Sequence, residues 1–141
     1  MIQIDRRRSP RDLLPKIERL FALSAGKILS IEETWKPGRG APVFTVQGRY
    51  QTRGWTEWTE GFQIGSAVLQ FDATGDREFL ELGRSRTRER MAPHLTNMGV
   101  HDHGFNIVST YGQFARLARE GNEPSFIAAR YGTPDCRSRR G

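Results

Sequence analysis

Thr74-Gly75-Asp76, near the middle of a 141-residue chain, is the stretch that decides the fold. Glycine just past a helix end adopts the left-handed conformation that closes the helix, and aspartate after it favours the start of another helix. Apolar residues at helical spacing lead up to this turn over residues 58–73 and resume after it. They are Phe62, Ala67, Leu69 and Phe71 before the turn, and Phe79, Leu80 and Leu82 after it. The stretch predicts two antiparallel helices joined by a tight turn.

A further helix is predicted on the N-terminal side, over about residues 11–31. Ser9-Pro10 is typical of a helix start, because serine caps the first turn and proline fits the first helical position. An apolar stripe at helical spacing follows, made of Leu13, Leu14, Ile17, Leu20, Phe21, Ile28 and Leu29. Prolines and glycines then interrupt the pattern over residues 36–54, where we expect a long structured loop with short extended pieces at 43–46 and Tyr50.

The last predicted helix runs from Gly104 to Glu120 and closes at Gly121-Asn122. Its apolar positions are Ile107, Val108, Tyr111, Phe114 and Leu117. Four helices make two antiparallel hairpins, so the sequence predicts an all-α fold. The residues expected to face one another in its core are Leu13, Ile17, Leu20, Leu69, Phe71, Phe79, Ile107, Tyr111 and Phe114.

The composition changes after Pro124. Residues 125–141 hold four arginines against one acid, Asp135, and no apolar period remains from Gly132 onward. We therefore expect a helical domain over residues 1–124, followed by a basic tail that is exposed and poorly ordered. So abrupt a break is also what a truncated or frame-shifted reading frame produces, a hypothesis that the DNA sequence downstream would test.

The net charge of +6 is concentrated in the same tail. Removing residues 125–141 takes away four of the 22 basic and one of the 16 acidic residues, which leaves a net charge of +3. No nucleic-acid-binding motif accompanies the basic residues, and we expect no nucleic-acid partner.

The sequence disfavours a membrane protein, a secreted protein and a protein with disulfides or a thiolate metal site. No apolar run approaches the length of a membrane span, and the charged N-terminus is unlike a signal peptide, so we expect a cytoplasmic protein without a membrane partner. Cys136 is the single cysteine, which leaves no disulfide within the chain and no thiolate metal site. We expect neither a cofactor nor a metal.

Two short motifs carry residue types that bind and process sugars. They are Trp58-Thr59-Glu60-Gly61-Phe62 and His101-Asp102-His103-Gly104-Phe105. Aromatic rings stack on the C–H face of a pyranose, and carboxyl groups perform acid and base chemistry at its oxygen atoms. Simpler roles stay open, since Asp102 could only cap the last helix and Trp58 could be a packing residue.

Together with Thr74-Gly75-Asp76 and Phe79-Leu80, these motifs resemble the N-terminal part of glycoside hydrolase family 88, the unsaturated glucuronyl hydrolases. The resemblance covers about residues 30–120 and keeps the family's order of motifs. It implies part of a six-hairpin α/α barrel with Asp102 as a catalytic carboxylate. It also implies a sugar-binding role for the residues around Asp102 and for Trp58, namely Trp58, Glu60, Phe62, His101 and His103.

The implied substrate is an oligosaccharide that ends in an unsaturated uronic acid. One carboxyl group protonates the 4,5 double bond, water adds at the electron-poor carbon, and the hemiketal opens to release the second sugar. Such a carboxyl has to give and recover a proton near neutral pH. The family's second essential carboxylate lies farther along than this chain extends, so we expect weak or no turnover by the chain alone.

Two consequences follow for the arrangement. Two hairpins supply only the first third of such a barrel, which leaves apolar helix faces bare and favours self-association. The second and fourth helices point the same way, so Trp58, Glu60 and Asp102 should meet at one end of the bundle. The alternative function is that of a non-enzymatic helical remnant or scaffold protein.

Overall fold

The structure, a computed structural model, describes residues 9–35, 38–98 and 102–121 and is predominantly helical. Helix α1 spans Pro10–Thr34 and begins as the sequence predicts, with proline at its first position. The Asp12 carboxylate accepts hydrogen bonds from the Ser9 N–H at 2.7 Å and the Ser9 hydroxyl at 3.0 Å. These bonds hold the pKa of Asp12 below its usual value.

The predicted turn joins helix α2, Thr59–Thr74, to helix α3, Arg77–Arg90. Gly75 has a φ of 74°, and its N–H donates to the Phe71 carbonyl at 2.7 Å. The Asp76 carboxylate caps α3 by accepting from the Glu78 N–H at 3.0 Å. The two antiparallel helices are therefore confirmed, with the glycine and the aspartate in the predicted roles.

The last predicted helix is continuous but not uniform. It begins as α4, His103–Ile107, widens into a π-helical turn, η2, over Val108–Gly112, and continues as α5, Gln113–Arg119. A short 3₁₀ turn, η1, spans Ala92–Leu95 and follows α3 in the chain, before this last helix begins.

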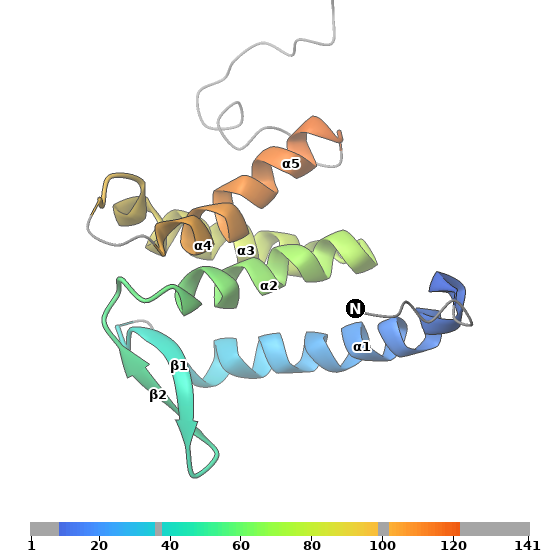
Figure 1. The fold of residues 1–141 in the computed structure, drawn as a ribbon, viewed down its shortest axis with the longest axis horizontal. Helices are drawn as coiled ribbons and strands as arrows, with labels where there is room; N and C mark the ends of the chain where they lie inside the picture. Colours follow the sequence, from blue (N-terminus) through green and yellow to red (C-terminus); the bar gives the residue numbers. More distant parts are fainter. Residues whose placement is uncertain (1–8, 36–37, 99–101, 122–141) are drawn as a thin grey trace, which may run out of the picture.

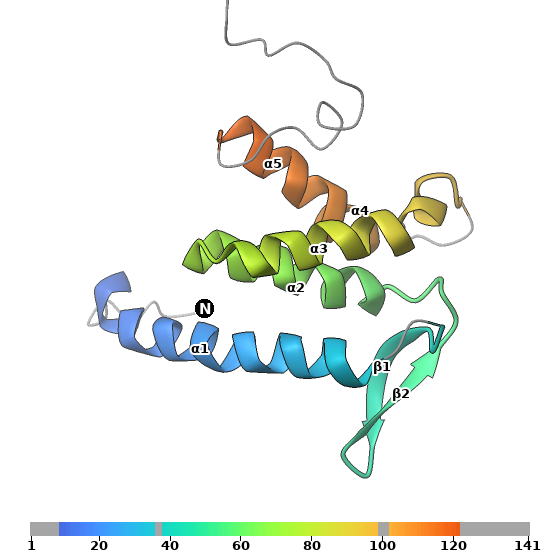
Figure 2. The ribbon, with the colours of Figure 1, turned by 180° about the vertical axis from the view of Figure 1, so that it is seen from behind.

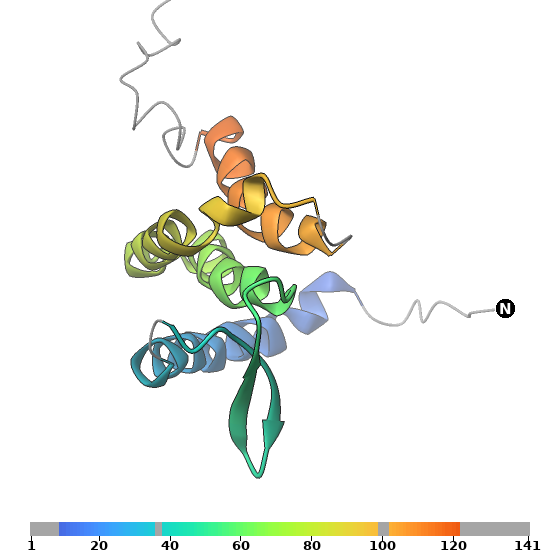
Figure 3. The ribbon, with the colours of Figure 1, turned by 90° about the vertical axis from the view of Figure 1, so that its left-hand side faces the viewer.

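Three layers make up the described part of the molecule (Figures 1 and 3). The α2–α3 hairpin forms the middle layer, with α1 on one side and α4 and α5 on the other. Seen from behind, α3 lies alongside α2 and returns to the end where α2 begins (Figure 2). Helices α2 and α4 consequently start at the same end of the bundle, as the predicted topology requires.

The core lies where the layers meet. Its buried apolar residues are Ile28, Ala67, Val68, Phe71, Phe79, Leu80, Phe114 and Leu117. The contribution of Phe71, Phe79 and Phe114 was expected, and Ile107 and Tyr111 are half-buried beside them. The α2–α3 contact is close because Gly83 faces Val68, where an added Cβ would come within 2.7 Å of the valine side chain.

The prediction of a buried stripe on the first helix is wrong for its N-terminal half. Leu13, Ile17 and Leu20 are 40 %, 42 % and 60 % exposed, and Leu69 on α2 is 52 % exposed. A helix of 25 residues is about 37 Å long, whereas the 16 residues of α2 span about 24 Å. The start of α1 therefore extends past the helix on which it packs (Figure 1).

The expected loop before α2 contains a β-hairpin, which corrects the all-α prediction to a predominantly helical one. Strand β1, Ala41–Val46, pairs antiparallel with β2, Arg49–Arg53. Gln47 and Gly48, between them, have φ values of 50° and 74°. Two consecutive residues with positive φ form the kind of two-residue turn whose twist suits a hairpin.

Two predictions concern residues that lie outside the described ranges, namely His101 and the basic tail from Gly132 onward. Within the described ranges, no helix is both long enough and apolar enough to cross a membrane.

Candidate functional site

The two sugar-type motifs meet through an aromatic cluster, which consists of Trp58, Phe62 and Phe105. The ring centroids lie 5.4 Å apart for Trp58 and Phe62, 5.7 Å for Trp58 and Phe105, and 5.6 Å for Phe62 and Phe105. Each ring nevertheless keeps 39–48 % of its surface in contact with water. The cluster therefore forms an open apolar surface beside the starts of α2 and α4.

Asp102 occupies the N-cap position of α4, next to this cluster. Its carbonyl accepts the Phe105 N–H at 3.0 Å, which places the two residues in the same first turn. The residue is half-buried, and its carboxylate makes no capping hydrogen bond to α4. The structure thus brings Trp58 and Asp102 to one end of the bundle, as expected.

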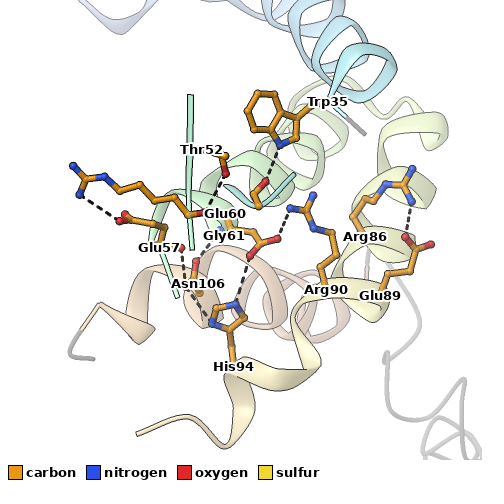
Figure 4. A network of polar contacts seen from close by, with 12 residues as sticks. Trp35, Thr52, Glu57, Glu60, Gly61, Arg86, Glu89, Arg90, His94 and Asn106 are labelled. Carbon is orange, nitrogen blue, oxygen red and sulfur yellow. Dashed lines mark hydrogen bonds and ion pairs between the residues drawn. The ribbon is translucent and has the colours of Figure 1, made fainter. Parts of the chain in front are cut away.

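Glu60 lies on another side of α2, in a polar network that consists of Glu60, Arg90, His94 and Asn106 (Figure 4). Only 4 % of Glu60 is exposed. One carboxylate oxygen pairs with the Arg90 guanidinium, and the other lies 3.7 Å from His94 Nε2. Glu60 therefore neutralises a cation from α3, and its predicted contact with a sugar stays a prediction.

Asn106 joins the start of α4 to the start of α2, and no pattern in the sequence predicts this role. Its Oδ1 accepts the Gly61 N–H at 2.8 Å, and its Nδ2 donates to the Glu57 carbonyl at 3.3 Å. An added Cβ on Gly61 would come within 2.4 Å of the Asn106 Cα. The glycine of the Trp-Thr-acid-Gly-Phe motif is therefore needed for the two helices to approach.

His94 was missed as well, because no local pattern marks a single histidine after a helix. It is 2 % exposed, and its Nδ1 lies 3.3 Å from Asn106 Nδ2. Burial lowers the pKa of His94, the negative charge of Glu60 opposes that shift, and the nearby His103 reinforces it. The imidazole is therefore neutral near pH 7.

A row of rings connects this network to Asp102. The His94 ring centroid lies 5.3 Å from that of Trp55 and 5.5 Å from that of His103, the residue after Asp102. Neither ring nitrogen of His103 hydrogen-bonds to a described residue. Among residues 9–35, 38–98 and 102–121, no group of three histidine, cysteine or acidic side chains is placed to hold a metal ion.

Two hollows flank the start of α2. Trp58 and Phe62 line one of about 330 Å³, between α1, the hairpin, α2 and α3, whose lining also includes Tyr50 and Arg86. Glu60 lines the other, of about 480 Å³, together with Arg90 and Trp55. The predicted binding residues are thus divided between two sides of one helix.

Comparison of the chain with family models, with curated proteins and with solved structures found no match.

Proposed function

We propose that this chain is a glycoside hydrolase-like protein that binds oligosaccharides ending in an unsaturated uronic acid. The observation that carries the proposal is the aromatic cluster beside Asp102, whose rings pack together yet stay 39–48 % exposed. Aromatic surface open to water suits the C–H face of a pyranose, and a carboxyl group at its edge suits acid chemistry on the same sugar.

The arrangement of the helices supports the proposal that the fold is part of a six-hairpin α/α barrel. Helices α2 and α4 start at one end, while α1 and α3 run in the opposite direction (Figures 1 and 2). A repeat of such antiparallel pairs is the way in which helical barrels and solenoids grow.

In the proposed reaction, Asp102 is the carboxyl group that gives a proton to the 4,5 double bond of the uronic acid. Water then adds at the electron-poor carbon and returns a proton to the Asp102 carboxylate, and the hemiketal opens to release the second sugar. The family pattern requires a second carboxylate to complete this work. With Asp102 alone, we expect the sugar to bind with weak or no turnover.

A second candidate is a non-enzymatic helical protein that associates with itself. The observation that favours it is the apolar N-terminal half of α1, which exposes Leu13, Leu14, Ile17, Leu20 and Leu23 by 40–60 % each. Contiguous apolar surface of this kind is typical of association sites. Here the aromatic cluster would be one more bare face, and no sugar would bind.

Titration of the full chain with an unsaturated uronic-acid disaccharide, followed by NMR, separates the candidates. We expect Trp58→Ala to weaken binding about tenfold, because about 1.4 kcal/mol is a reasonable value for one stacked ring. Met98→Ala is the matched control, since Met98 is 95 % exposed and lies outside the cluster. No binding by the unaltered chain, or equal effects of the two substitutions, would rule out the proposed site.

Asp102→Asn tests the catalytic assignment. Loss of absorbance of the conjugated double bond reports turnover, and any slow rate of the chain should vanish with asparagine, which cannot donate an acid proton. The free energy of unfolding should change by about 1 kcal/mol or less, because asparagine is as well tolerated at an N-cap as aspartate. An unchanged rate in Asp102→Asn would exclude Asp102 as the proton donor.

A further inference from the structure

The hollow on the Glu60 side of α2 is lined by three arginines from three separate segments. Arg39 precedes β1, Arg53 ends β2, and Arg90 ends α3. Trp55 and Glu60 also line this hollow, which has a volume of about 480 Å³. A sequence in which these arginines are 14 and 37 residues apart gives no local sign of this grouping.

The segment before β1 is held in place by specific contacts. The buried Trp35 donates from Nε1 to the Gly40 carbonyl at 2.8 Å, and the Arg39 guanidinium lies 4.6 Å from the centre of the Trp35 ring. Gly40 has a φ of 76°, and an added Cβ would come within 2.5 Å of the Arg53 carbonyl oxygen. A larger residue would not fit there, so the close approach of Gly40 sets Arg39 and Arg53 at one hollow.

The charges around the hollow do not balance. Arg90 is paired with Glu60, and Arg53 lies 3.6 Å from Glu57. Arg39 has no carboxylate partner among the residues that the structure describes. Three guanidinium groups therefore face two carboxylates, which leaves one positive charge for a ligand to neutralise.

Trp55 gives the hollow an apolar wall. It is 51 % exposed, and the edge-to-face contact of its ring with His94, at 5.3 Å between centroids, fixes its position. The buried His94 separates this wall from His103 and the start of α4. A planar apolar face next to unpaired guanidinium suits a ligand that combines a sugar ring with one negative charge.

We infer that this hollow is a second sugar subsite, separate from the aromatic cluster that takes the terminal unsaturated residue, and that it binds a sugar with a carboxylate. In it, Arg39 and Arg53 select the charge, and Trp55 is the ring on which the sugar stacks. The kind of sugar rests on the proposed function, whereas the preference for an anion rests on the arginines alone. The guanidinium groups form charge-assisted hydrogen bonds with the carboxylate, and a neutral sugar makes none of these.

The test compares glucuronate with glucose, which differ by the carboxylate, as ligands of the full chain in NMR titrations. We expect glucuronate to bind about tenfold more tightly, as typical for one well-placed charge-assisted contact. Arg39→Gln with Arg53→Gln should reduce that ratio to about one. Arg19→Gln, an exposed arginine on α1, is the matched control and should leave the ratio unchanged.

Trp55→Ala should weaken both sugars to a similar extent and keep their ratio, because stacking does not depend on charge. Equal affinity for glucuronate and glucose, or a ratio that survives the double arginine substitution, overturns the inference. If Trp58→Ala leaves the binding of the unsaturated disaccharide unchanged, the proposed function is contradicted. The inference is then decided by the ratio of the affinities for glucuronate and glucose, and by its loss in the double arginine variant.

Discussion

At the scale of single residues, Gly61 does most to hold the candidate site together. Its missing side chain lets α4 approach α2, and its N–H bonds to the side chain of Asn106, which is completely buried. The neighbour at 2.4 Å from an added Cβ is a backbone atom, so it cannot turn away as the end of a long side chain could.

We expect Gly61→Ala to lower the free energy of unfolding by about 2 kcal/mol or more, because the added methyl group overpacks this contact. Chemical denaturation of the two proteins measures the change. Gly26→Ala is the matched control, since Gly26 lies inside α1 with no atom within 4 Å of an added Cβ. Alanine there should stabilise the chain by up to about 1 kcal/mol through its better helix propensity. Equal changes in the free energy of unfolding at both positions would show that the α2–α4 contact accommodates an added methyl group.

His94 makes stability depend on pH. Because burial lowers its pKa below the usual 6.5, the unfolded chain binds a proton more readily than the folded chain. The groups that face the ring are Glu60, which favours the charged form, and His103, which disfavours it. The free energy of unfolding should therefore fall as the pH is lowered from about 7.5 through 6.5 toward 5.5.

Thermal unfolding across this pH range measures the effect. His94→Asn removes the titrating ring and keeps an amide that can meet Asn106, so its melting temperature should depend less on pH over the same interval. An unchanged dependence in His94→Asn would assign the effect to another group.

At the scale of elements, the two halves of α1 differ in how they are anchored. The C-terminal half buries Ile28, Trp35 is buried directly after its end, and Glu32 accepts from Arg86 Nε on α3 at 2.6 Å. Residues 10–20 are all exposed, and near the middle of the helix the Phe21 carbonyl accepts from Gln70 Nε2 at 3.1 Å. Local opening is easier where fewer apolar side chains are buried.

Hydrogen exchange should therefore be at least about tenfold faster at residues 14–20 than at residues 28–34, which corresponds to a difference of about 1.4 kcal/mol in local stability. Glu32→Gln weakens the contact with Arg86 and should speed exchange in 28–34 only. Uniform protection along α1 in dilute solution would mean that its N-terminal half is covered as firmly as the rest.

The elements also show which predictions the sequence can support. The Thr74-Gly75-Asp76 turn was predictable, because its capping and left-handed conformation depend on neighbouring residues alone. The exposure of Leu13 and Leu20 was not, because it depends on the length of α2. The hairpin left a weaker signal in the sequence, because only one of its two turn residues is a glycine and Gln47, the other, is not a residue type that favours the positive φ it adopts.

At the scale of the whole molecule, the order of the helices predicted that Trp58 and Asp102 lie at one end, but it did not predict the partners of Glu60. Trp58 and Asp102 share one end because α2 and α4 run parallel, a conclusion that needs only the order of the helices. The environment of Glu60 depends on Arg90 and His94, which lie 30 and 34 residues farther along the chain. No periodicity within α2 could reveal that its carboxylate is paired with α3.

The π-helical turn at Val108–Gly112 sets the rotation of the last helix about its own axis. In a regular α-helix, each residue turns the helix by about 100°, so the eight residues from Asn106 to Phe114 would leave them about 80° apart. A π-helical turn contains more residues than an α-helical one, so it reduces the angle between Asn106 and Phe114. Both residues are buried. Deleting one residue from this turn would rotate the start of α4, with Asp102 and Phe105, relative to the core contacts of Phe114, and would change the site without replacing any residue in it.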